Sequence, residues 1–377
     1  MTSTGREVDE NASAETVLFV VPSLRVGGAE RVLIRIANGL VATGRKVTVA
    51  VIERAGDLAA QLDDRISIEY LGGRRTIHAG VAIARMVRRL RPDVVFSTLT
   101  RVNLLILLCR PLFPSGTRLV VRQPSPASVE AQTPRVGRVY EVLIRRLYPT
   151  ADVVINQSHA MAADLIENFA IPASKVVTIG NPAPPVDIDQ LMKQPSPFPA
   201  GVNYLAVGRL VREKGYEDLI EAFSQVAATR LDARLTILGT GPMEPDIHRD
   251  VVARGLAARV HLLGLIDDPL PYYVHADALV LASWREGFPN CLVESLACGT
   301  PVVTTDCFGA VAELVTPGAN GIVVEARKPQ QLARAMIHVT SIRDRVGRER
   351  IVGTVKGYSS EVILRRYVEL CSRPRVV

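Results

Sequence analysis

Short apolar runs rich in valine and isoleucine alternate with amphipathic stretches along nearly the whole chain. In the first half the runs read TVLFVVP, KVTVAVI, ISIEYL, DVVFSTL, RLVVRQ, ADVVINQS and KVVTIGNP, and in the second half NYLAVGRL, ARLTILG, RVHLLG, ALVLAS, PVVTTD and GIVVE. Strands that are apolar on both sides must be covered on both faces, as they are in parallel sheets flanked by helices. The alternation therefore predicts an α/β protein with two doubly wound, Rossmann-like domains that face each other across a cleft.

A proline-rich segment separates the two series of strands. NPAPPVDIDQLMKQPSPFPAG contains six prolines between positions 182 and 199, which is typical of a linker. The cleft between the two domains is the expected ligand site. The predicted organisation is a disordered tail at 1–15, a first domain at 16–182, a linker at 183–200, a second domain at 201–355 and a terminal segment at 356–377 with a helix near 359–371.

The apolar runs are all shorter than the roughly 18 residues that a membrane-spanning helix needs. The first fifteen residues lack the apolar core of a signal peptide. Five cysteines, at positions 109, 291, 298, 307 and 371, form no Cys-x-x-Cys pair and no cluster with zinc spacing. We therefore expect buried reduced thiols, no metal site and a cytoplasmic protein.

Positive charge is concentrated in the first half of the chain. Residues 1–182 carry 23 Lys and Arg against 16 Asp and Glu, whereas residues 183–377 carry 22 of each kind. This asymmetry indicates an anionic partner for the first domain. An anionic membrane at the inner face of the plasma membrane would fit. Nucleic acid is disfavoured because no recognition module is present.

Two of the basic stretches read as amphipathic helices. In 76–90 the apolar stripe is Ile83, Met86, Val87 and Leu90, beside Arg85, Arg88 and Arg89. In 135–147 it is Val136, Val139, Tyr140, Leu143 and Leu147, beside Arg135, Arg138, Arg145 and Arg146. Both apolar stripes are expected to face the core, with the arginines at the surface.

The segment ALVLASWREGFPNCLVESLACGTPVVTTD carries two carboxylates in a suggestive arrangement. A strand should end near Ser283, and a helix should begin with Asn290 as its N-cap and end at Gly299. Glu286 then lies on the loop and Glu294 lies one turn inside the helix. The N-terminus of such a helix offers free N–H groups and a positive dipole end to an anion.

A second segment, VGRLVREKGYEDLIEAF, places Arg209 and Lys214 after a strand and just before a glycine and a helix. Two cations at the carboxyl end of a strand suit a diphosphate, although two solvated surface charges remain the alternative. Near the amino terminus, Gly27 and Gly28 stand between a strand and a helix. They predict a tight turn with backbone angles closed to other residues, a bare backbone that approaches a ligand, or both.

Together Glu286-x7-Glu294, Arg209 with Lys214, LLGLIDD at 262–268 and the Gly27-Gly28 loop resemble the GT-B glycosyltransferases of the retaining family 4, the glycosyl transferases group 1. The resemblance covers almost the whole chain and is densest from 203 to 325. It implies a nucleotide-diphosphate sugar, with uridine as the usual base, in the second domain. It also implies a saccharide or lipid-linked acceptor in the first domain, with cell-surface polysaccharide or glycolipid as the product.

The resemblance also implies residue roles. Arg209 and Lys214 would grip the diphosphate, Glu286 would contact the sugar hydroxyls, and these three are the expected catalytic residues. Glu294 would bind the ribose, and Gly27 and Gly28 would close over the diphosphate. Further donor contacts are expected from Gly264, Leu265, Gly287, Phe288, Pro289, Asn290 and Cys291. The sugar is transferred with retention of configuration, without an enzyme nucleophile, a metal or another cofactor.

The chain departs from the family in one loop, VVRQPSPASVEAQTP, which lacks the histidine that many relatives carry near the sugar. Arg122, Gln123 and Ser125 are the acceptor-side candidates there, and His159 reads as a capping or surface residue. Asp187-Ile-Asp189 resembles a metal motif of the other glycosyltransferase fold, but its place in the linker makes that a chance match. A nucleotide-sugar epimerase, a sugar phosphorylase and a non-catalytic sugar-nucleotide-binding subunit remain alternatives.

Overall fold

The computed structural model describes residues 15–25, 27–56, 58–72, 79–132 and 136–372. Residues 1–14 of the predicted tail, residues 76–78 of the first basic stretch and Arg135 of the second lie outside the described residues.

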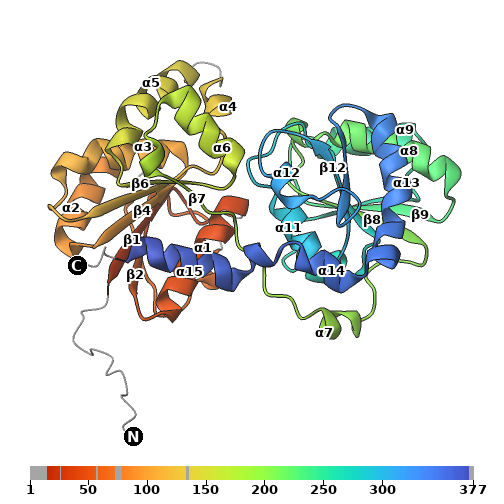
Figure 1. The fold of residues 1–377 in the computed structure, drawn as a ribbon, viewed down its shortest axis with the longest axis horizontal. Helices are drawn as coiled ribbons and strands as arrows, with labels where there is room; N and C mark the ends of the chain where they lie inside the picture. Colours follow the sequence, from red (N-terminus) through yellow and green to blue (C-terminus); the bar gives the residue numbers. More distant parts are fainter. Residues whose placement is uncertain (1–14, 26, 57, 73–78, 133–135, 373–377) are drawn as a thin grey trace, which may run out of the picture. The chain divides into compact units, whose positions relative to one another are not determined.

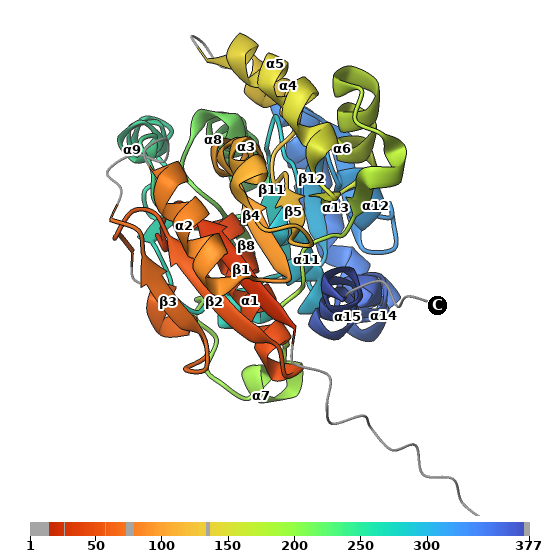
Figure 2. The ribbon, with the colours of Figure 1, turned by 90° about the vertical axis from the view of Figure 1, so that its left-hand side faces the viewer.

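The first half of the chain forms a seven-stranded sheet in the order β3-β2-β1-β4-β5-β6-β7, with helices on both faces (Figures 1 and 2). Its paired strands run parallel, as in β1 with β2 and with β4. The strands are β1 Thr16–Val21, β2 Lys46–Val51, β3 Ser67–Tyr70, β4 Val94–Thr98, β5 Arg118–Arg122, β6 Val153–Asn156 and β7 Val176–Thr178. The helices are α1 Gly28–Ala42, α2 Gly80–Leu90, α3 Thr100–Cys109, α4 Ala127–Ala131, α5 Gly137–Leu147 and α6 His159–Ala163.

The second half forms a six-stranded sheet in the order β10-β9-β8-β11-β12-β13. Its strands are β8 Val202–Val207, β9 Ala233–Leu238, β10 Val260–Gly264, β11 Ala278–Leu281, β12 Val302–Asp306 and β13 Gly321–Glu325. Its helices are α8 Tyr216–Thr229, α9 Glu244–Ala253, α10 Leu270–His275, α11 Asn290–Ala297, α12 Val311–Leu314, α13 Pro329–Val346 and α14 Arg348–Gly353. Among the described residues the thirteen strands coincide with the thirteen predicted runs, and the predicted α/β class with two doubly wound sheets is confirmed.

Each sheet has one point at which the strand order reverses. In the first sheet the chain fills β1, β2 and β3 outward in one direction and then returns to place β4 beside β1. In the second sheet β11 likewise returns to pair with β8. Loops that leave the carboxyl ends of the two central strands diverge to opposite faces, and the crevice between them is the usual ligand site of such sheets. The fold therefore directs attention to the loops after β1, β4, β8 and β11.

By contacts the chain divides into two compact units. One contains the described residues up to Gln123, then Val142–Ile155 and the residues from Leu364 onward, and the other contains Pro124–Glu141 and Asn156–Ile363. The predicted terminal helix is confirmed as α15, Ser360–Cys371. Its second half joins the first unit, where the Tyr367 ring is buried 6.1 Å from that of Phe96 and Arg45 donates to Ser372 Oγ at 2.8 Å.

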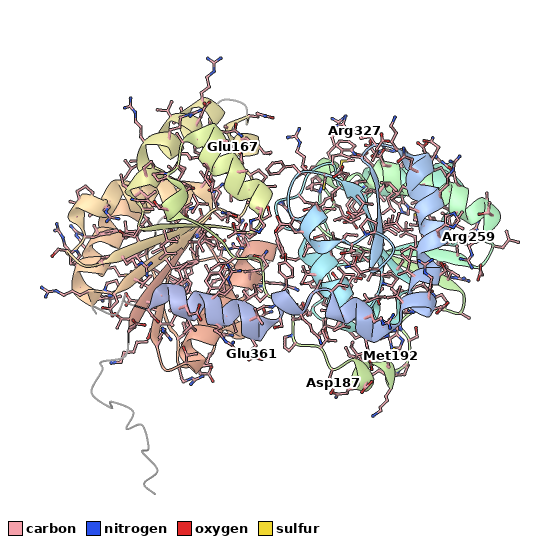
Figure 3. All side chains as sticks on the ribbon, in the orientation of Figure 1. Glu167, Asp187, Met192, Arg259, Arg327 and Glu361 are labelled. Atoms are coloured by element: carbon pink, nitrogen blue, oxygen red, sulfur yellow. The ribbon has the colours of Figure 1, made fainter. Side chains whose placement is uncertain are left out.

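The proline-rich segment contains one short helix, α7, at Ile188–Met192. Asp187, labelled in Figure 3, caps it by accepting a hydrogen bond from the Gln190 N–H at 3.0 Å. An N-cap carboxylate satisfies a helix-end donor that would otherwise lack a partner. This cap gives Asp187 a local structural role that needs no metal.

The two basic helices differ in what they bury. On α2, Ile83, Met86 and Val87 are buried as predicted, and Arg85, Arg88 and Arg89 are exposed. In the second basic stretch the prediction is wrong for Val136, which precedes α5 and is 41% exposed, and for Val139 on α5, which is 55% exposed. The core-facing side is instead provided by Ile144, with Tyr140, Leu143 and Leu147 half-buried. Helix α5 therefore has apolar residues, Val139 and Val142, that lie outside its buried side.

Candidate active site

The strongest constellation of polar side chains lies at the reversal point of the second sheet. Because β8 and β11 are neighbours, the loop after Val207 and the loop after Leu281 leave the sheet side by side. The first loop carries Arg209 and Lys214, and the second carries Glu286. Two segments far apart in the sequence thus bring two cations and a carboxylate to one edge of the sheet.

Lys214 and Glu286 form an ion pair at the centre of this edge. The Lys214 Nζ lies 2.6 Å from Glu286 Oε1, and the two side chains are 18% and 9% exposed. The Ser283 hydroxyl donates to the same oxygen at 2.6 Å. Burial lowers the pKa of Lys214, but the nearby Glu286 carboxylate outweighs it, so the net pKa is raised. Lys214 therefore stays charged at neutral pH despite its burial.

Trp284 links the loop after β11 to the loop after β8 and to α8. Its backbone N–H donates to Glu213 O at 2.8 Å, and its indole Nε1 donates to Asp218 Oδ2 at 2.6 Å on α8. The Arg327 guanidinium lies 4.2 Å from the centre of its ring. Such contacts hold the loop of Glu286 in one place relative to Lys214. Apart from its position two residues before Glu286, nothing in the sequence pattern marked this tryptophan.

Gly215 is required where the two loops meet. It has a φ of +63°, and a Cβ there would lie 2.2 Å from Ala282 O. Both the left-handed conformation and the lack of space exclude other residues. This glycine lets the turn after Lys214 pack against the end of β11.

Helix α11 starts beside the ion pair and carries the second glutamate. Glu294 Oε2 accepts a hydrogen bond from the Tyr273 hydroxyl at 2.8 Å. Tyr273 lies on α10 and is buried, and burial raises the pKa of its hydroxyl well above the usual value. The hydroxyl therefore stays protonated and fixes one carboxylate oxygen. Tyr273 is a site residue that sequence reasoning missed, because strand β11 and a loop separate α10 from Glu294 in the sequence.

The start of α11 differs in detail from the prediction. Asn290 is its first helical residue, Pro289 is the N-cap, and no side chain caps the helix. The Asn290 side chain instead accepts from Asn181 Nδ2 at 2.7 Å. The first N–H groups of a helix have no intrahelical acceptor, so the prediction that they face an anion is compatible with this start. The predicted end is confirmed, since Gly299 follows the Cys298 C-cap with a φ of +69°.

The remaining predicted donor residues occupy the same edge of the second sheet. Arg209 is exposed two residues after the end of β8, and Gly264 ends β10 with a φ of +71°. Leu265 beside it is 53% exposed. In the loop after β11, Gly287 is half-buried and Phe288, Pro289 and Cys291 are buried. These placements are consistent with the predicted contacts.

The Gly27-Gly28 loop follows β1 at the reversal point of the first sheet. Gly27 has a φ of −164° and a ψ of 159°, which is extended backbone open to any residue, and Gly28 begins α1 without a positive φ. The prediction of backbone angles closed to other residues is therefore wrong. A Cβ on Gly27 would lie 2.2 Å from Glu30 Oε2, but a small rotation of that flexible side chain would relieve the contact.

On the other side of the reversal point of the first sheet, after β4, Leu99 does have a strained backbone conformation. This residue joins β4 to α3 with a φ of 71°. A leucine rarely adopts a positive φ, and such residues persist only where the surrounding structure holds them. The sequence DVVFSTLT gave no hint of it, because no glycine or asparagine marks the turn.

Two of the acceptor-side candidates are internal. Arg122 is 1% exposed and its Nη1 donates to Thr98 Oγ1 at 3.4 Å. Gln123 is fully buried, and its Nε2 donates to Thr100 Oγ1 at 2.9 Å. Ser125 is half-buried, and His159 is an exposed residue at the start of α6, where Ser158 forms the cap. Acceptor contact by the first two stays a prediction, and their observed bonds hold β4, β5 and α3 together.

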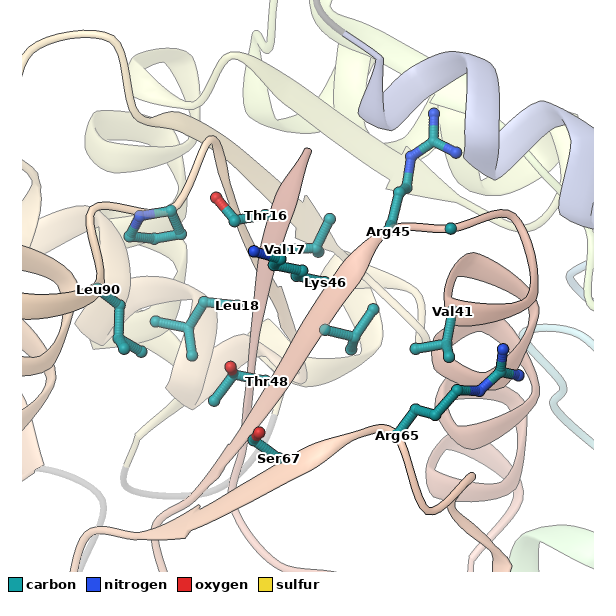
Figure 4. Close-up of a pocket in the computed structure, with 13 residues that line it drawn as sticks. Thr16, Val17, Leu18, Val41, Arg45, Lys46, Thr48, Arg65, Ser67 and Leu90 are labelled. Carbon is teal, nitrogen blue, oxygen red and sulfur yellow. The ribbon is translucent and has the colours of Figure 1, made fainter. Parts of the chain in front are cut away.

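A pocket of about 440 Å³ in the first unit lies at the opposite edge of its sheet (Figure 4). It is lined by Thr16 and Lys46, the first residues of β1 and β2, and by Arg45 and Arg65. Arg45 pairs with Glu15 and Arg65 with Asp63. Because ligands of doubly wound sheets bind at the carboxyl ends of strands, and because these two cations are already paired, we do not assign the active site to this pocket.

Within the described ranges, no group of three or more His, Cys, Asp or Glu side chains is arranged to hold a metal ion. In the same part of the chain, no helix combines the length and apolar character that crossing a bilayer requires.

Two family models match the chain. The model described as Glycosyltransferase Family 4 matches residues 26–186, and the model described as Glycosyl transferases group 1 matches residues 201–341.

Similar proteins come from several bacteria and an archaeon. An N-acetylgalactosamine-N,N'-diacetylbacillosaminyl-diphospho-undecaprenol 4-alpha-N-acetylgalactosaminyltransferase of Campylobacter jejuni is 32% identical over 64% of this chain and 65% of its own length. The match to an uncharacterized glycosyltransferase of Methanocaldococcus jannaschii covers 61% of that protein, so the chain spans less than two thirds of either relative. The lipopolysaccharide core glycosyltransferase LpsE of Rhizobium meliloti is 26% identical over 92% of this chain and 97% of its own.

Solved structures share the fold. A glycosyltransferase from Rickettsia africae has a TM-score of 0.78 and 19% identity, covering 96% of this chain and 98% of its own. HepE of Anabaena, solved in complex with UDP, has a TM-score of 0.75 and 22% identity, covering 94% and 99%.

Proposed function

Because the chain belongs to the group 1, or family 4, glycosyltransferases with the GT-B fold, we propose that it transfers a sugar from a nucleotide-diphosphate donor to a saccharide or lipid-linked acceptor in polysaccharide or glycolipid synthesis. The observation that carries the proposal is the ion pair of Lys214 and Glu286 at the reversal point of the second sheet, next to the start of α11. UDP is the proposed carrier, since HepE of Anabaena is solved with UDP and glucose.

The geometry leaves both members of the ion pair capacity for a ligand. The Lys214 ammonium has three N–H donors, and Glu286 takes one of them. Glu286 Oε1 accepts from both Lys214 and Ser283, while no bond from another described residue reaches Oε2. Two N–H donors can therefore turn toward diphosphate oxygens, and Oε2 can accept from a sugar hydroxyl.

Catalysis would then be mainly electrostatic. As the bond between the sugar and the diphosphate breaks, negative charge grows on the phosphate oxygens, and Lys214, Arg209 and the first N–H groups of α11 would stabilise it. In the retaining mechanism that we propose, the acceptor attacks on the face of the leaving group. A diphosphate oxygen takes the acceptor's proton, so no enzyme nucleophile forms a bond to the sugar.

The acceptor is proposed to bind the first domain, with Arg122, Gln123 and Ser125 as the candidates for contact with it. The Campylobacter relative is described as acting on a diphospho-undecaprenol-linked saccharide and LpsE as acting in lipopolysaccharide core synthesis. An acceptor of this kind would bring the enzyme to the inner face of the plasma membrane, where the excess of arginines in the first half favours anionic lipid.

A panel of nucleotides and sugars tests the proposed function. Thermal-shift measurements with nucleoside diphosphates and their sugars should identify the donor, and product analysis should then show release of the nucleoside diphosphate with a glycosylated acceptor. An epimerised donor would indicate the epimerase, and a sugar phosphate formed from inorganic phosphate would indicate the phosphorylase. Donor binding without any turnover across an acceptor panel would indicate the non-catalytic subunit.

Glu294 should act mainly in donor binding. If it holds the ribose hydroxyls, the contact is present equally in ground and transition states, so Glu294→Ala should raise the donor KM more than it lowers kcat. Tyr273→Phe should produce a weaker effect of the same kind, roughly a fivefold rise in KM, because it removes one hydrogen bond.

Tyr272→Phe is the matched control, because the Tyr272 ring packs against Phe198 at 5.5 Å and the hydroxyl that donates to Glu294 is that of Tyr273. Steady-state kinetics with varied donor distinguish the cases. An unchanged KM with a collapsed kcat would move Glu294 into the chemical step and contradict the assignment.

Transfer should survive excess chelator. Lys214, Arg209 and the N–H groups at the start of α11 together can compensate the charge of a diphosphate without a divalent ion. Initial rates with and without EDTA test this expectation. Complete loss of activity that magnesium or manganese restores would show that a metal is required.

A further inference from the structure

Asn181 lies outside the two loops of the candidate active site, yet its side chain reaches the start of α11. It is 6% exposed, and its Nδ2 donates to Asn290 Oδ1 at 2.7 Å. The two residues are 109 positions apart in the sequence. Asn181 begins the proline-rich segment, and Asn290 is the first residue of a helix that no side chain caps. The bond therefore connects the proline-rich segment to the helix end where we place the diphosphate.

Contacts on both sides of Asn181 hold its backbone in place. Gly180 is buried against two rings, because a Cβ there would lie 2.5 Å from Tyr358 Cε1 and 3.1 Å from Phe288 Cε2. The centres of these rings are 5.6 Å apart. On the other side, the Ala183 N–H donates to Tyr358 O at 2.8 Å. A side chain on a fixed backbone loses little conformational freedom when it forms a bond, so Asn181 is well suited to orient a partner.

The bond from Asn181 decides which end of the Asn290 amide is left for a ligand. Oδ1 accepts from Asn181, whereas no bond from Nδ2 to another described residue is present. Asn290 is half-buried, and its Nδ2 is open to solvent. An amide nitrogen offers two N–H donors. They stand at the helix end whose first backbone N–H groups also lack intrahelical acceptors.

We propose that Asn181 is a positioning residue for donor binding, which holds the Asn290 amide with its Nδ2 turned toward the diphosphate. Charged phosphate oxygens only accept hydrogen bonds, so an amide turned the other way would present an acceptor to an acceptor. Asn181 acts through Asn290 and needs no contact of its own with the ligand. This inference rests on the proposed function and adds a residue to its donor site that lies outside the loops after β8 and β11.

Two isosteric variants test the orientation while a hydrogen bond between the two positions is kept. In Asn290→Asp the carboxylate still accepts from Asn181 but replaces Nδ2 with a charged acceptor, so affinity for UDP should fall roughly 30-fold. In Asn181→Asp the carboxylate can only accept, so Asn290 must turn its Nδ2 inward and present Oδ1, and the loss should be roughly tenfold. Calorimetric titration gives the Kd for UDP and for uridine. Uridine has no phosphate and should bind both variants as it binds the wild type.

A double-mutant cycle tests whether Asn181 acts through Asn290. Asn181→Ala releases the amide and Asn290→Ala removes it, and each should weaken UDP binding roughly fivefold. The double variant should then bind UDP no more weakly than Asn290→Ala alone. Gln330→Glu is the matched control for charge, because it adds one negative charge at an exposed residue near the start of α13 and should leave the Kd for UDP unchanged.

The proposal would be overturned by wild-type affinity of Asn290→Asp for UDP or by losses that add in the double alanine variant. Equal weakening of UDP and uridine binding by Asn181→Ala would also overturn it, because that result indicates a general loosening of α11. A wild-type protein that binds no nucleoside diphosphate would contradict the proposed function itself, and this inference with it. Binding of UDP by the wild type with no change in the variants would contradict the role of Asn181 alone.

Discussion

Replacing Lys214 with alanine is expected to lower kcat/KM for glycosyl transfer by roughly 30- to 1,000-fold, and Arg209→Ala should have an effect in the same range. Each removes a charge-assisted contact to a diphosphate on which charge is growing, which is worth roughly 2–4 kcal/mol in the barrier. Arg212→Ala is the matched control. It removes an exposed cation from the turn between these two residues and should leave transfer near the wild-type rate.

The Lys214 variant needs a second control, because it leaves the Glu286 carboxylate buried without its ion-pair partner. Such a loss can destabilise the fold as well as the transition state. In the double variant Lys214→Ala, Glu286→Gln no charge is left unpaired, so its melting temperature should recover while its activity does not. Activity of Lys214→Ala and Arg209→Ala within threefold of wild type would refute the diphosphate assignment.

Glu286→Gln should lower transfer roughly 100-fold and also change its dependence on pH. The amide keeps the size of the side chain but loses the charge that would bind the sugar hydroxyls as they polarise in the transition state. The same charge is what keeps the pKa of Lys214 raised against the effect of burial. Without it, burial should bring the pKa of Lys214 below its ordinary value of 10.5.

The sign of the pH effect follows directly. Lys214 must be protonated to hold phosphate, so the alkaline decline of kcat/KM should begin at lower pH in Glu286→Gln than in wild type. Ser283→Ala removes the other hydrogen bond to Glu286 but no charge, so its kcat/KM should decline at the same alkaline pH as that of the wild type. Profiles of kcat/KM from neutral to alkaline pH test this. A limb that moves to higher pH in Glu286→Gln would contradict the role of the carboxylate.

The sequence by itself determined the fold class and the local setting of the main motif. Short runs rich in valine and isoleucine that alternate with amphipathic stretches are typical of parallel sheets covered by helices, so the thirteen strands of the described residues, edge strands included, follow from a short-range pattern. The spacing of Glu286 and Glu294 likewise placed one carboxylate on a loop and the other on a helix, and α11 has this arrangement. These features depend on residues within a few turns of one another.

The tertiary structure alone decided which distant groups meet. The pairing of Lys214 with Glu286 joins residues 72 positions apart, and it exists because β11 returns to lie beside β8. The bond from Tyr273 to Glu294 depends in the same way on how α10 and α11 pack. Periodicity also could not decide the orientation of α5, because a helix with apolar residues on two sides can bury only one. Contacts with residues distant in the sequence bury the side of α5 that carries Ile144 and leave Val139 and Val142 exposed.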